Sequence, residues 1–138
     1  MWEVIASFKR VKGFDEFPQK KATEIIYKKL IPKLESQNVY LSNYGNHNDP
    51  RSLQSIGDYK KRRDDYKLFD IARVQRAFLS VAFYLEPSRK WDSGSYGLKH
   101  YIERQTDEYL TNGDLIVAML LSGYKAKFYG VNCEFKVK

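Results

Sequence analysis

One short segment combines the residue types that bind polyanions. A run of four cations stands between two tyrosines, and the segment comprises Tyr59, Lys60, Lys61, Arg62, Arg63 and Tyr66. Four consecutive cations cannot be buried, so the run must lie at the surface. Cations hold phosphates without reading the sequence, and aromatic faces stack on unpaired bases. The segment therefore indicates nucleic-acid binding, although a basic run is also typical of a solvated surface with no ligand.

Two other basic pairs extend this candidate surface. Lys99 and Arg104 fall on the outward side of a predicted helix, and Lys125 and Lys127 alternate with apolar residues near the C-terminus. With the segment at 59–66, these residues form the candidate nucleic-acid-binding site. The net charge agrees with it, since 24 Lys and Arg against 17 Asp and Glu give +7. Such an excess attracts phosphate backbones or acidic protein surfaces.

The residues that usually carry enzyme chemistry are sparse. His47 and His100 are isolated, and there is no Cys pair, glycine-rich phosphate loop or metal-ligand spacing. The triplet 47–49 slightly resembles a nuclease His-Asn pairing. His100, paired with Glu103 on a helix face, could act as a general base. Cys133 lies in an apolar alternation and is predicted to be a buried small residue. We expect no catalytic residue, no metal and no cofactor.

The longest apolar run predicts the centre of the fold. Residues 115–121 are all apolar, Asp114 precedes them as a predicted N-cap, and Gly123 can close a helix. A helix that is apolar on every side must be surrounded by protein. The sequence therefore predicts a short buried helix at 114–122. A buried strand is the alternative, because periodicity does not separate the two in short runs.

Helical spacing predicts further helices around this one. The first begins near Asp15 and Pro18 and ends or kinks near Ile31, because Pro32 removes a helix hydrogen bond. Residues 36–49 read as a long loop with a short strand at 39–41. A short helix follows Asp49, and Gly57 interrupts it. The next helix runs from Leu68 to about Leu85, with a predicted apolar stripe of Leu68, Ile71, Ala72, Gln75, Phe78, Leu79 and Ala82, which Val74, Val81 and Leu85 widen.

The segment 95–123 invites comparison with a helix-turn-helix. A helix at 95–110, capped by Ser93 or Ser95, is followed by a predicted tight turn at 111–113 and then by the apolar helix. A recognition helix needs polar side chains that face base edges, and residues 115–121 offer none. The interpretation is an αα-hairpin whose second helix belongs to the core. Asp70 and Arg73, on the preceding helix, are predicted to pair on its polar side.

Both ends of the chain alternate with a period of two. Residues 2–8 predict a strand with one buried face, and residues 124–137 predict a β-hairpin that turns at 130–132. An isolated hairpin is marginal in water, so the two ends are predicted to pair. The expected fold is α+β, a mostly helical bundle around the buried helix with a small antiparallel sheet. The 138 residues suit one domain.

The same features define the expected partners and compartment. The N-terminus lacks the pattern of a signal peptide, no apolar run approaches a membrane span, and one Cys cannot form an internal disulfide. We expect a soluble intracellular protein of cytoplasm, nucleus or virion, with no membrane partner. The partner is nucleic acid, DNA or RNA, or an acidic protein surface, and a homo-oligomer stays open.

The Lys, Asn and Tyr usage resembles that of small proteins from viruses and mobile elements with AT-rich genomes. The leading hypothesis is a non-enzymatic nucleic-acid-binding protein that uses phosphate contacts and aromatic stacking. The alternative is a viral or mobile-element accessory or structural protein that acts through protein–protein interaction.

Overall fold

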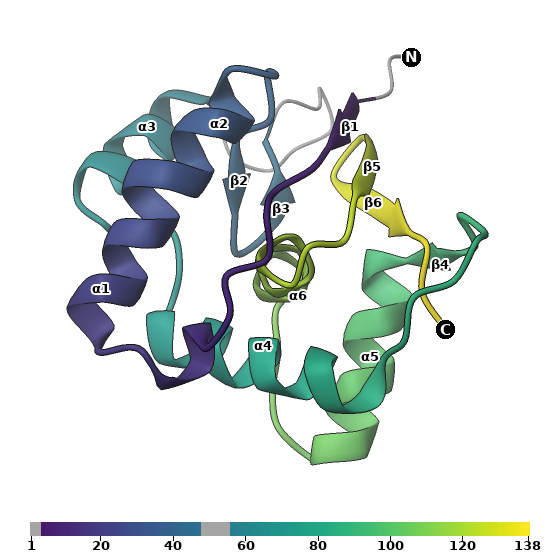
Figure 1. Cartoon of the computed structure of the whole chain (residues 1–138). Coiled ribbons are helices and arrows are strands. Elements are labelled where there is room, and N and C mark those ends of the chain that lie inside the picture. The colour runs from purple at the N-terminus through teal and green to yellow at the C-terminus, as the bar shows by residue number, and fades with distance from the viewer. Residues whose placement is uncertain (1–3, 48–55) are drawn as a thin grey trace.

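A single buried helix forms the centre of an α+β fold. The computed structural model describes residues 4–47 and 56–138. Helix α6 (Asn112–Leu121) is seen end-on at the centre of Figure 1, with the other elements around it. All residues from 113 to 121 are buried. This confirms the predicted buried helix and removes the buried-strand alternative.

The start of α6 differs in detail from the prediction. Thr111 is the N-cap, and its hydroxyl accepts the Asp114 N–H at 3.0 Å while the Asp114 carboxylate accepts the Thr111 N–H at 3.1 Å. This is a capping box, which satisfies two free N–H groups at once. Asp114 is therefore the third helical residue, and residues 111–113 begin the helix instead of forming a separate tight turn. Gly123, with φ of +91°, follows the helix end as predicted.

Two long helices pack directly on α6. Helix α5 (Ser95–Thr106) makes the predicted αα-hairpin with it, and α4 (Ile71–Tyr84) crosses below it (Figure 1). The predicted stripe on α4 is only partly correct. The buried residues are Ile71, Val74, Ala77, Phe78 and Val81. Ala72, Leu79 and Ala82 face solvent, because α4 is apolar over more than one face and periodicity alone does not select the face that packs.

The N-terminal helical region continues past the predicted stop. A 3-10 turn, η1 (Phe14–Glu16), precedes α1 (Gln19–Glu24), the π-helix η2 (Ile25–Leu30) and α2 (Ile31–Glu35). Of the two outcomes predicted at Pro32, an end or a kink of the helix, the end is wrong, because helical structure continues through Pro32 to Glu35. The Ile31 N–H bonds to the Ile26 carbonyl, five residues back, so the turn before Pro32 is already widened. A proline ring clashes with the carbonyl four residues earlier in a regular α-helix, and the π register relieves that conflict.

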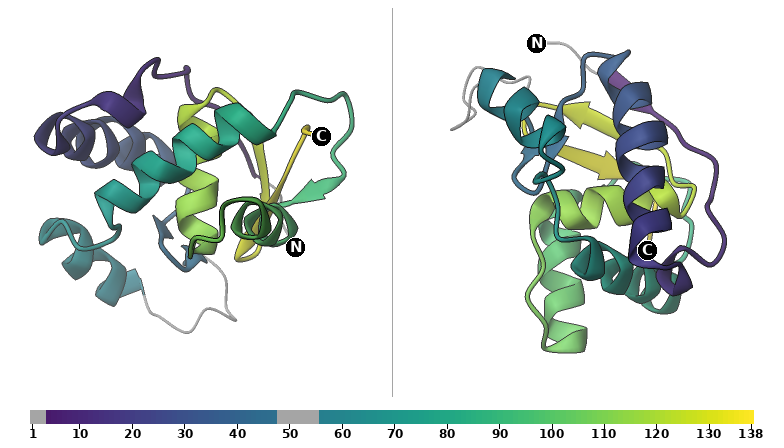
Figure 2. Two further views of the ribbon diagram at one scale, coloured as in Figure 1. Left: turned by 90° about the horizontal axis from the view of Figure 1, so that it is seen from below. Right: turned by 90° about the vertical axis from the view of Figure 1, so that its left-hand side faces the viewer.

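The two ends of the chain form one antiparallel sheet. Its order is β1 (Val4–Ala6), β5 (Ala126–Tyr129), β6 (Asn132–Phe135) and β4 (Ser93–Gly94). Strand β1 pairs with β5, with Ala6 opposite Ala126, as the matched alternation predicts. Strand β4 was not predicted. The right panel of Figure 2 shows β5 and β6 beside α6, so the sheet covers one side of the core.

A smaller ribbon and a helix complete the described chain. Strands β2 (Leu41–Ser42) and β3 (Gly45–Asn46) form a hairpin beside the start of α6, where the Asn43 carbonyl accepts the Gly113 N–H at 3.0 Å. Helix α3 (Ile56–Asp64) passes through Gly57 without the predicted interruption. The predicted helix start at Asp49 lies outside the described residues. Within the described parts of the chain, no helix is long and apolar enough to cross a membrane.

Candidate nucleic-acid interface

The predicted site residues occupy three separate places in the fold. The segment 59–66 belongs to α3 and the turn after it, Lys99 and Arg104 belong to α5, and Lys125 and Lys127 lie at β5. Helices α3 and α5 lie on different sides of α6 in Figures 1 and 2. The fold therefore does not assemble these residues into one patch, and each group must be judged by its own surroundings.

Tyr59 is a core residue and cannot stack on a base. Its side chain is 0% exposed, its ring lies edge-on to Tyr40 at 5.5 Å, and its hydroxyl donates to Glu35 Oε2 at 3.0 Å. Burial, followed by the nearby Glu35 carboxylate, raises the pKa of Tyr59. Its place among the site residues was therefore wrong. Helix α3 turns this ring inward while the neighbouring cations face outward.

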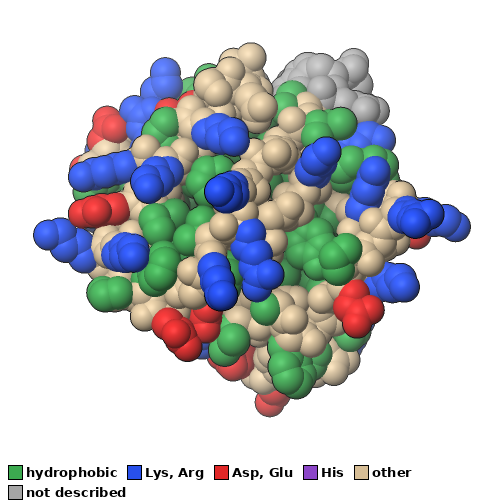
Figure 3. Space-filling model, in the orientation of Figure 1, with side chains coloured by type: hydrophobic (Ala, Val, Ile, Leu, Met, Phe, Trp, Pro, Cys, Tyr) green, Lys and Arg blue, Asp and Glu red, His purple; other side chains and the backbone are tan. Residues whose placement is uncertain are grey.

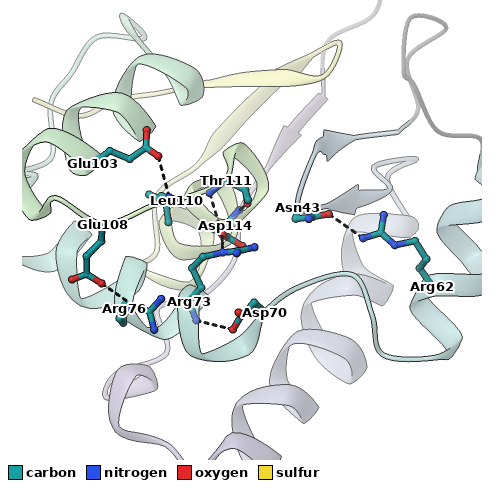
Figure 4. Close-up of polar contacts among 10 residues, drawn as sticks. All are labelled: Asn43, Arg62, Asp70, Arg73, Arg76, Glu103, Glu108, Leu110, Thr111 and Asp114. Atoms are coloured by element: carbon teal, nitrogen blue, oxygen red, sulfur yellow. Dashed lines mark hydrogen bonds and ion pairs between the residues drawn. The ribbon is translucent and has the colours of Figure 1, made fainter.

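The four cations of α3 divide into two structural arginines and two exposed lysines. Arg63 pairs with Glu35 at 2.7 Å. Arg62 donates to Asn43 Oδ1 at 3.1 Å (Figure 4) and to the Lys67 carbonyl at 3.1 Å. These bonds fasten α3 to α2 and to the β2–β3 turn. Lys60 and Lys61 are exposed. Among the described residues neither lysine has an ion pair, so both ammonium groups face solvent.

Tyr66 is exposed and held in an unusual backbone conformation. Its side chain is 55% exposed and its φ is +55°. The Lys67 N–H bonds to the Arg62 carbonyl at 2.8 Å and the Tyr66 N–H to the Arg63 carbonyl at 3.0 Å. This is a Schellman end to α3, in which the position of Tyr66 usually belongs to glycine. The ring also packs against Tyr27, with centroids 4.9 Å apart.

Tyr66 stands at the edge of an open polar cleft, which we call the α3–α4 cleft. Its volume is about 580 Å³, and it is lined by Gln19, Thr23, Asn43, Tyr66, Lys67, Leu68, Phe69, Asp70, Ile71 and Arg73. The π-helix η2 supports one wall, because the Tyr27 hydroxyl accepts the Leu68 N–H at 2.8 Å and the Phe69 N–H at 3.3 Å. Binding pockets span roughly 300 to 1,000 Å³, so this cleft has room for a small ligand.

The back of the cleft is built on the start of α4. Asp70 caps this helix by accepting the Arg73 N–H at 3.2 Å. The Arg73 guanidinium turns away from Asp70 and pairs with the buried carboxylate of Asp114 (Figure 4). The predicted side-chain pair of Asp70 with Arg73 was therefore wrong, because Asp70 bonds to the backbone. Burial raises the pKa of Asp114, and the Thr111 N–H and Arg73 oppose that rise only in part.

The predicted site residues on α5 belong to a local network of polar contacts. Lys99 pairs with Glu103 at 3.1 Å and its ammonium lies 5.3 Å from the centre of the Tyr96 ring, while Arg104 is exposed. His100 also contacts Glu103, at 3.3 Å. Burial acts to raise the pKa of Glu103, but the Leu110 N–H, Lys99 and His100 together lower it. Glu103 therefore accepts hydrogen bonds from Lys99 and from the Leu110 N–H and holds this end of the helix.

The residues at the hairpin surround a tryptophan that sequence reasoning missed. The ammonium groups of Lys127 and Lys136 lie 5.7 and 5.0 Å from the centre of the Trp91 ring, and Lys125 is exposed. Such contacts are cation–π interactions. Trp91 is distant from both lysines in sequence, and only its aromatic type signalled it. The surface at the hairpin is therefore basic and aromatic.

The Ser42–His47 pair and the thiol of Cys133 are both buried. Ser42 Oγ contacts His47 Nε2, but the two residues are 0% and 3% exposed. Cys133 is buried as predicted, and burial raises the pKa of its thiol well above the usual value. Among the described residues no three His, Cys, Asp or Glu side chains are placed to share a metal ion.

No protein-family model, curated protein or solved structure matches this chain.

Proposed function

We propose that this protein binds nucleic acid at the α3–α4 cleft, with Lys67 and the exposed Lys60 and Lys61 of α3 on the phosphates and Tyr66 against a base. The observation that carries the proposal is the exposed Tyr66 ring at the edge of a polar cleft that Lys67 also lines. A cleft, a cation and an exposed aromatic ring therefore coincide at this place. Aromatic platforms beside cationic grooves are the usual means of binding single strands.

The distribution of charge supports the same function. Lys60, Lys61 and Lys67 are exposed on the last turns of α3 and just after it. Lys and Arg side chains are also spread over the face shown in Figure 3, with hydrophobic side chains between them. Asp65 and Asp70, both exposed, reduce the local positive charge near the cleft. We therefore expect binding that depends strongly on salt, because counterion release supplies most of its free energy.

The test separates the cleft lysines from basic charge in general. Changing Lys60, Lys61 and Lys67 to Ser removes three exposed ammonium groups and leaves the structural arginines in place. The salt slope of oligonucleotide binding should fall by up to about three units, one for each phosphate that loses its lysine. The control changes Lys125, Lys136 and Lys138 to Ser, which removes the same charge at the hairpin. An equal or larger effect of the control, measured by fluorescence anisotropy, would place binding at the sheet instead.

A second candidate function rests on a different surface. Leu79 and Phe83 on α4 are 56% and 79% exposed, and an exposed apolar pair on one helix face is typical of a protein contact. This favours the alternative of an accessory or structural protein that acts through protein–protein interaction, here through self-association. Sedimentation velocity should then show a concentration-dependent oligomer that the double change Leu79→Ser and Phe83→Ser abolishes. A monomer at all concentrations would contradict it.

A further inference from the structure

We infer that the α3–α4 cleft takes one unpaired nucleotide of a single strand, with its base against Tyr66 and its flanking phosphates on Lys60, Lys61 and Lys67. This inference rests on the proposed function and narrows its ligand. A duplex keeps its bases stacked and paired inside, so a side chain reaches their faces only when a base is unpaired or flipped out. A platform ring therefore distinguishes single strands from duplexes in a way that lysines cannot.

The ring of Tyr66 is both accessible and fixed. More than half of the side chain is exposed, at 55%, and the packing against Tyr27 holds its position. Tyr27 is itself buried and anchored through its hydroxyl to the Leu68 and Phe69 N–H groups. A stacking platform needs this rigidity, because a ring that must be ordered on binding loses part of the affinity it supplies.

The backbone at Tyr66 gives an independent reason. Its φ of +55° lies in the left-handed region, where a bulky residue is an outlier and glycine is favoured. The chain thus has a large aromatic residue at a position where glycine would make the folded protein more stable. The packing of Tyr66 against Tyr27 offsets part of the conformational free energy that the left-handed backbone costs. The exposed part of the ring is left available to stack on a ligand.

The remaining cleft residues suit the edges of a base. Gln19 and Asn43 carry amide groups and Asp70 carries a carboxylate, and all three line the cleft. Side-chain amides pair with adenine edges and carboxylates accept hydrogen bonds from exocyclic amino groups of bases. Asp70 would repel a phosphate, so we assign the flanking phosphates to the exposed ammonium groups of the lysines. Lys67 lines the cleft itself, and Lys60 and Lys61 are exposed on α3, which ends just before Tyr66.

The test uses the whole protein, a labelled single strand of about 15 nucleotides, and a duplex of the same sequence. Tyr66→Gly removes the ring and also the left-handed penalty, so the fold should be retained, which circular dichroism checks. We expect an affinity loss of about ten-fold for the single strand, within the range for one stacked base, and little change for the duplex. Tyr66→Phe should bind as the wild type does. Tyr96→Ala, at a tyrosine of similar exposure on α5, is the matched control and should have no effect.

The outcomes separate this inference from the proposed function. If the wild type binds no oligonucleotide at low salt, the proposed function fails and the inference fails with it. If it binds duplex and single strand equally and Tyr66→Gly changes neither, only the inference fails. Amide NMR shifts on titration with the single strand give a second measurement. Shifts at residues 66–71 would support the cleft, and shifts confined to the hairpin and Trp91 would overturn it.

Discussion

The surroundings of Asp114 act on the pKa of its carboxyl group in opposite directions. Its carboxylate completes the cap of α6 and pairs with Arg73, which favours the ionised form. Its complete burial favours the neutral form and prevails, so its pKa in the folded protein is raised above the ordinary value of 3.8. One carboxylate oxygen, Oδ1, also lacks a partner among the described atoms. Ionisation at this position therefore costs folding free energy.

The prediction compares the wild type with Asp114→Asn, which cannot ionise. The folded protein binds the Asp114 proton more tightly than the unfolded chain does. The stability from the protonated carboxyl is thus fully present below the unfolded pKa and is lost as pH rises through the folded pKa. We expect the free energy of unfolding of the wild type, relative to Asp114→Asn, to fall as pH rises above the unfolded pKa of about 4 and through the raised pKa of the folded state. Urea titrations across this range measure the difference, and a rise with pH would contradict the prediction.

The two tyrosines at the ends of the basic run show what residue patterns leave open. Tyr59 and Tyr66 are seven positions apart and would share a face of one continuous helix. Helix α3 ends at Asp64, and Tyr66, just after that end, takes the left-handed conformation. Its ring is therefore exposed, while the ring of Tyr59 lies in the core. Sequence reasoning predicted the exposed lysines, because charge forces them out. It did not predict which ring is buried, since that depends on where the helix ends.

At the scale of elements, glycine positions reveal where helices approach other backbone. Gly97 in α5 has open space where a Cβ would lie. At Gly113 in α6, an added Cβ would overlap the Ser42 carbonyl oxygen, which is backbone and cannot turn away. The β2–β3 hairpin therefore sits against the first turn of α6 only because Gly113 has no side chain. Both glycines lie in helices, so helix propensity alone predicts the same change in stability when either is replaced by alanine.

The paired substitutions Gly97→Ala and Gly113→Ala should therefore have opposite effects. Gly97→Ala should raise the free energy of unfolding by about 0.5 to 1 kcal/mol through lower backbone entropy in the unfolded chain. Gly113→Ala should lower it by about 3 kcal/mol or more, because the hairpin must move. Thermal and urea denaturation measure both. Equal effects would show that the hairpin does not pack on α6 as described.

Element boundaries were the least predictable part of the fold, for identifiable reasons. The buried helix, the αα-hairpin and the terminal strands follow from apolar run and period, and each was predicted. An end of the helix at Pro32 was expected because a regular α-helix was assumed, whereas the chain forms a π-helix just before this proline. That π-helix contains Tyr27, which supports the cleft wall. The element that local rules missed is thus one that shapes the candidate site.

At the scale of the whole molecule, the two ends of the chain close the core together. Strand β1 lies at the edge of the sheet and pairs only with β5, which comes more than a hundred residues later. On this strand Ala6 is 1% exposed and Ile5 is 53% exposed. Adjacent residues of one strand thus face the core and the solvent, as the period of two requires. The sheet in turn covers α6, so loss of β1 should affect more than its own residues.

Two substitutions place the same charge on opposite faces of β1. Ala6→Asp buries a carboxylate without a partner and should lower the free energy of unfolding by about 3 kcal/mol or more. Ile5→Asp, one residue away, should cost within about 1 kcal/mol because it stays in water at a strand edge. Deleting residues 1–8 should destabilise the whole fold, with faster amide exchange in β5 and in α6. If Ala6→Asp is tolerated, or if exchange after the deletion rises in β5 alone, β1 is an accessory strand and the core closes without it.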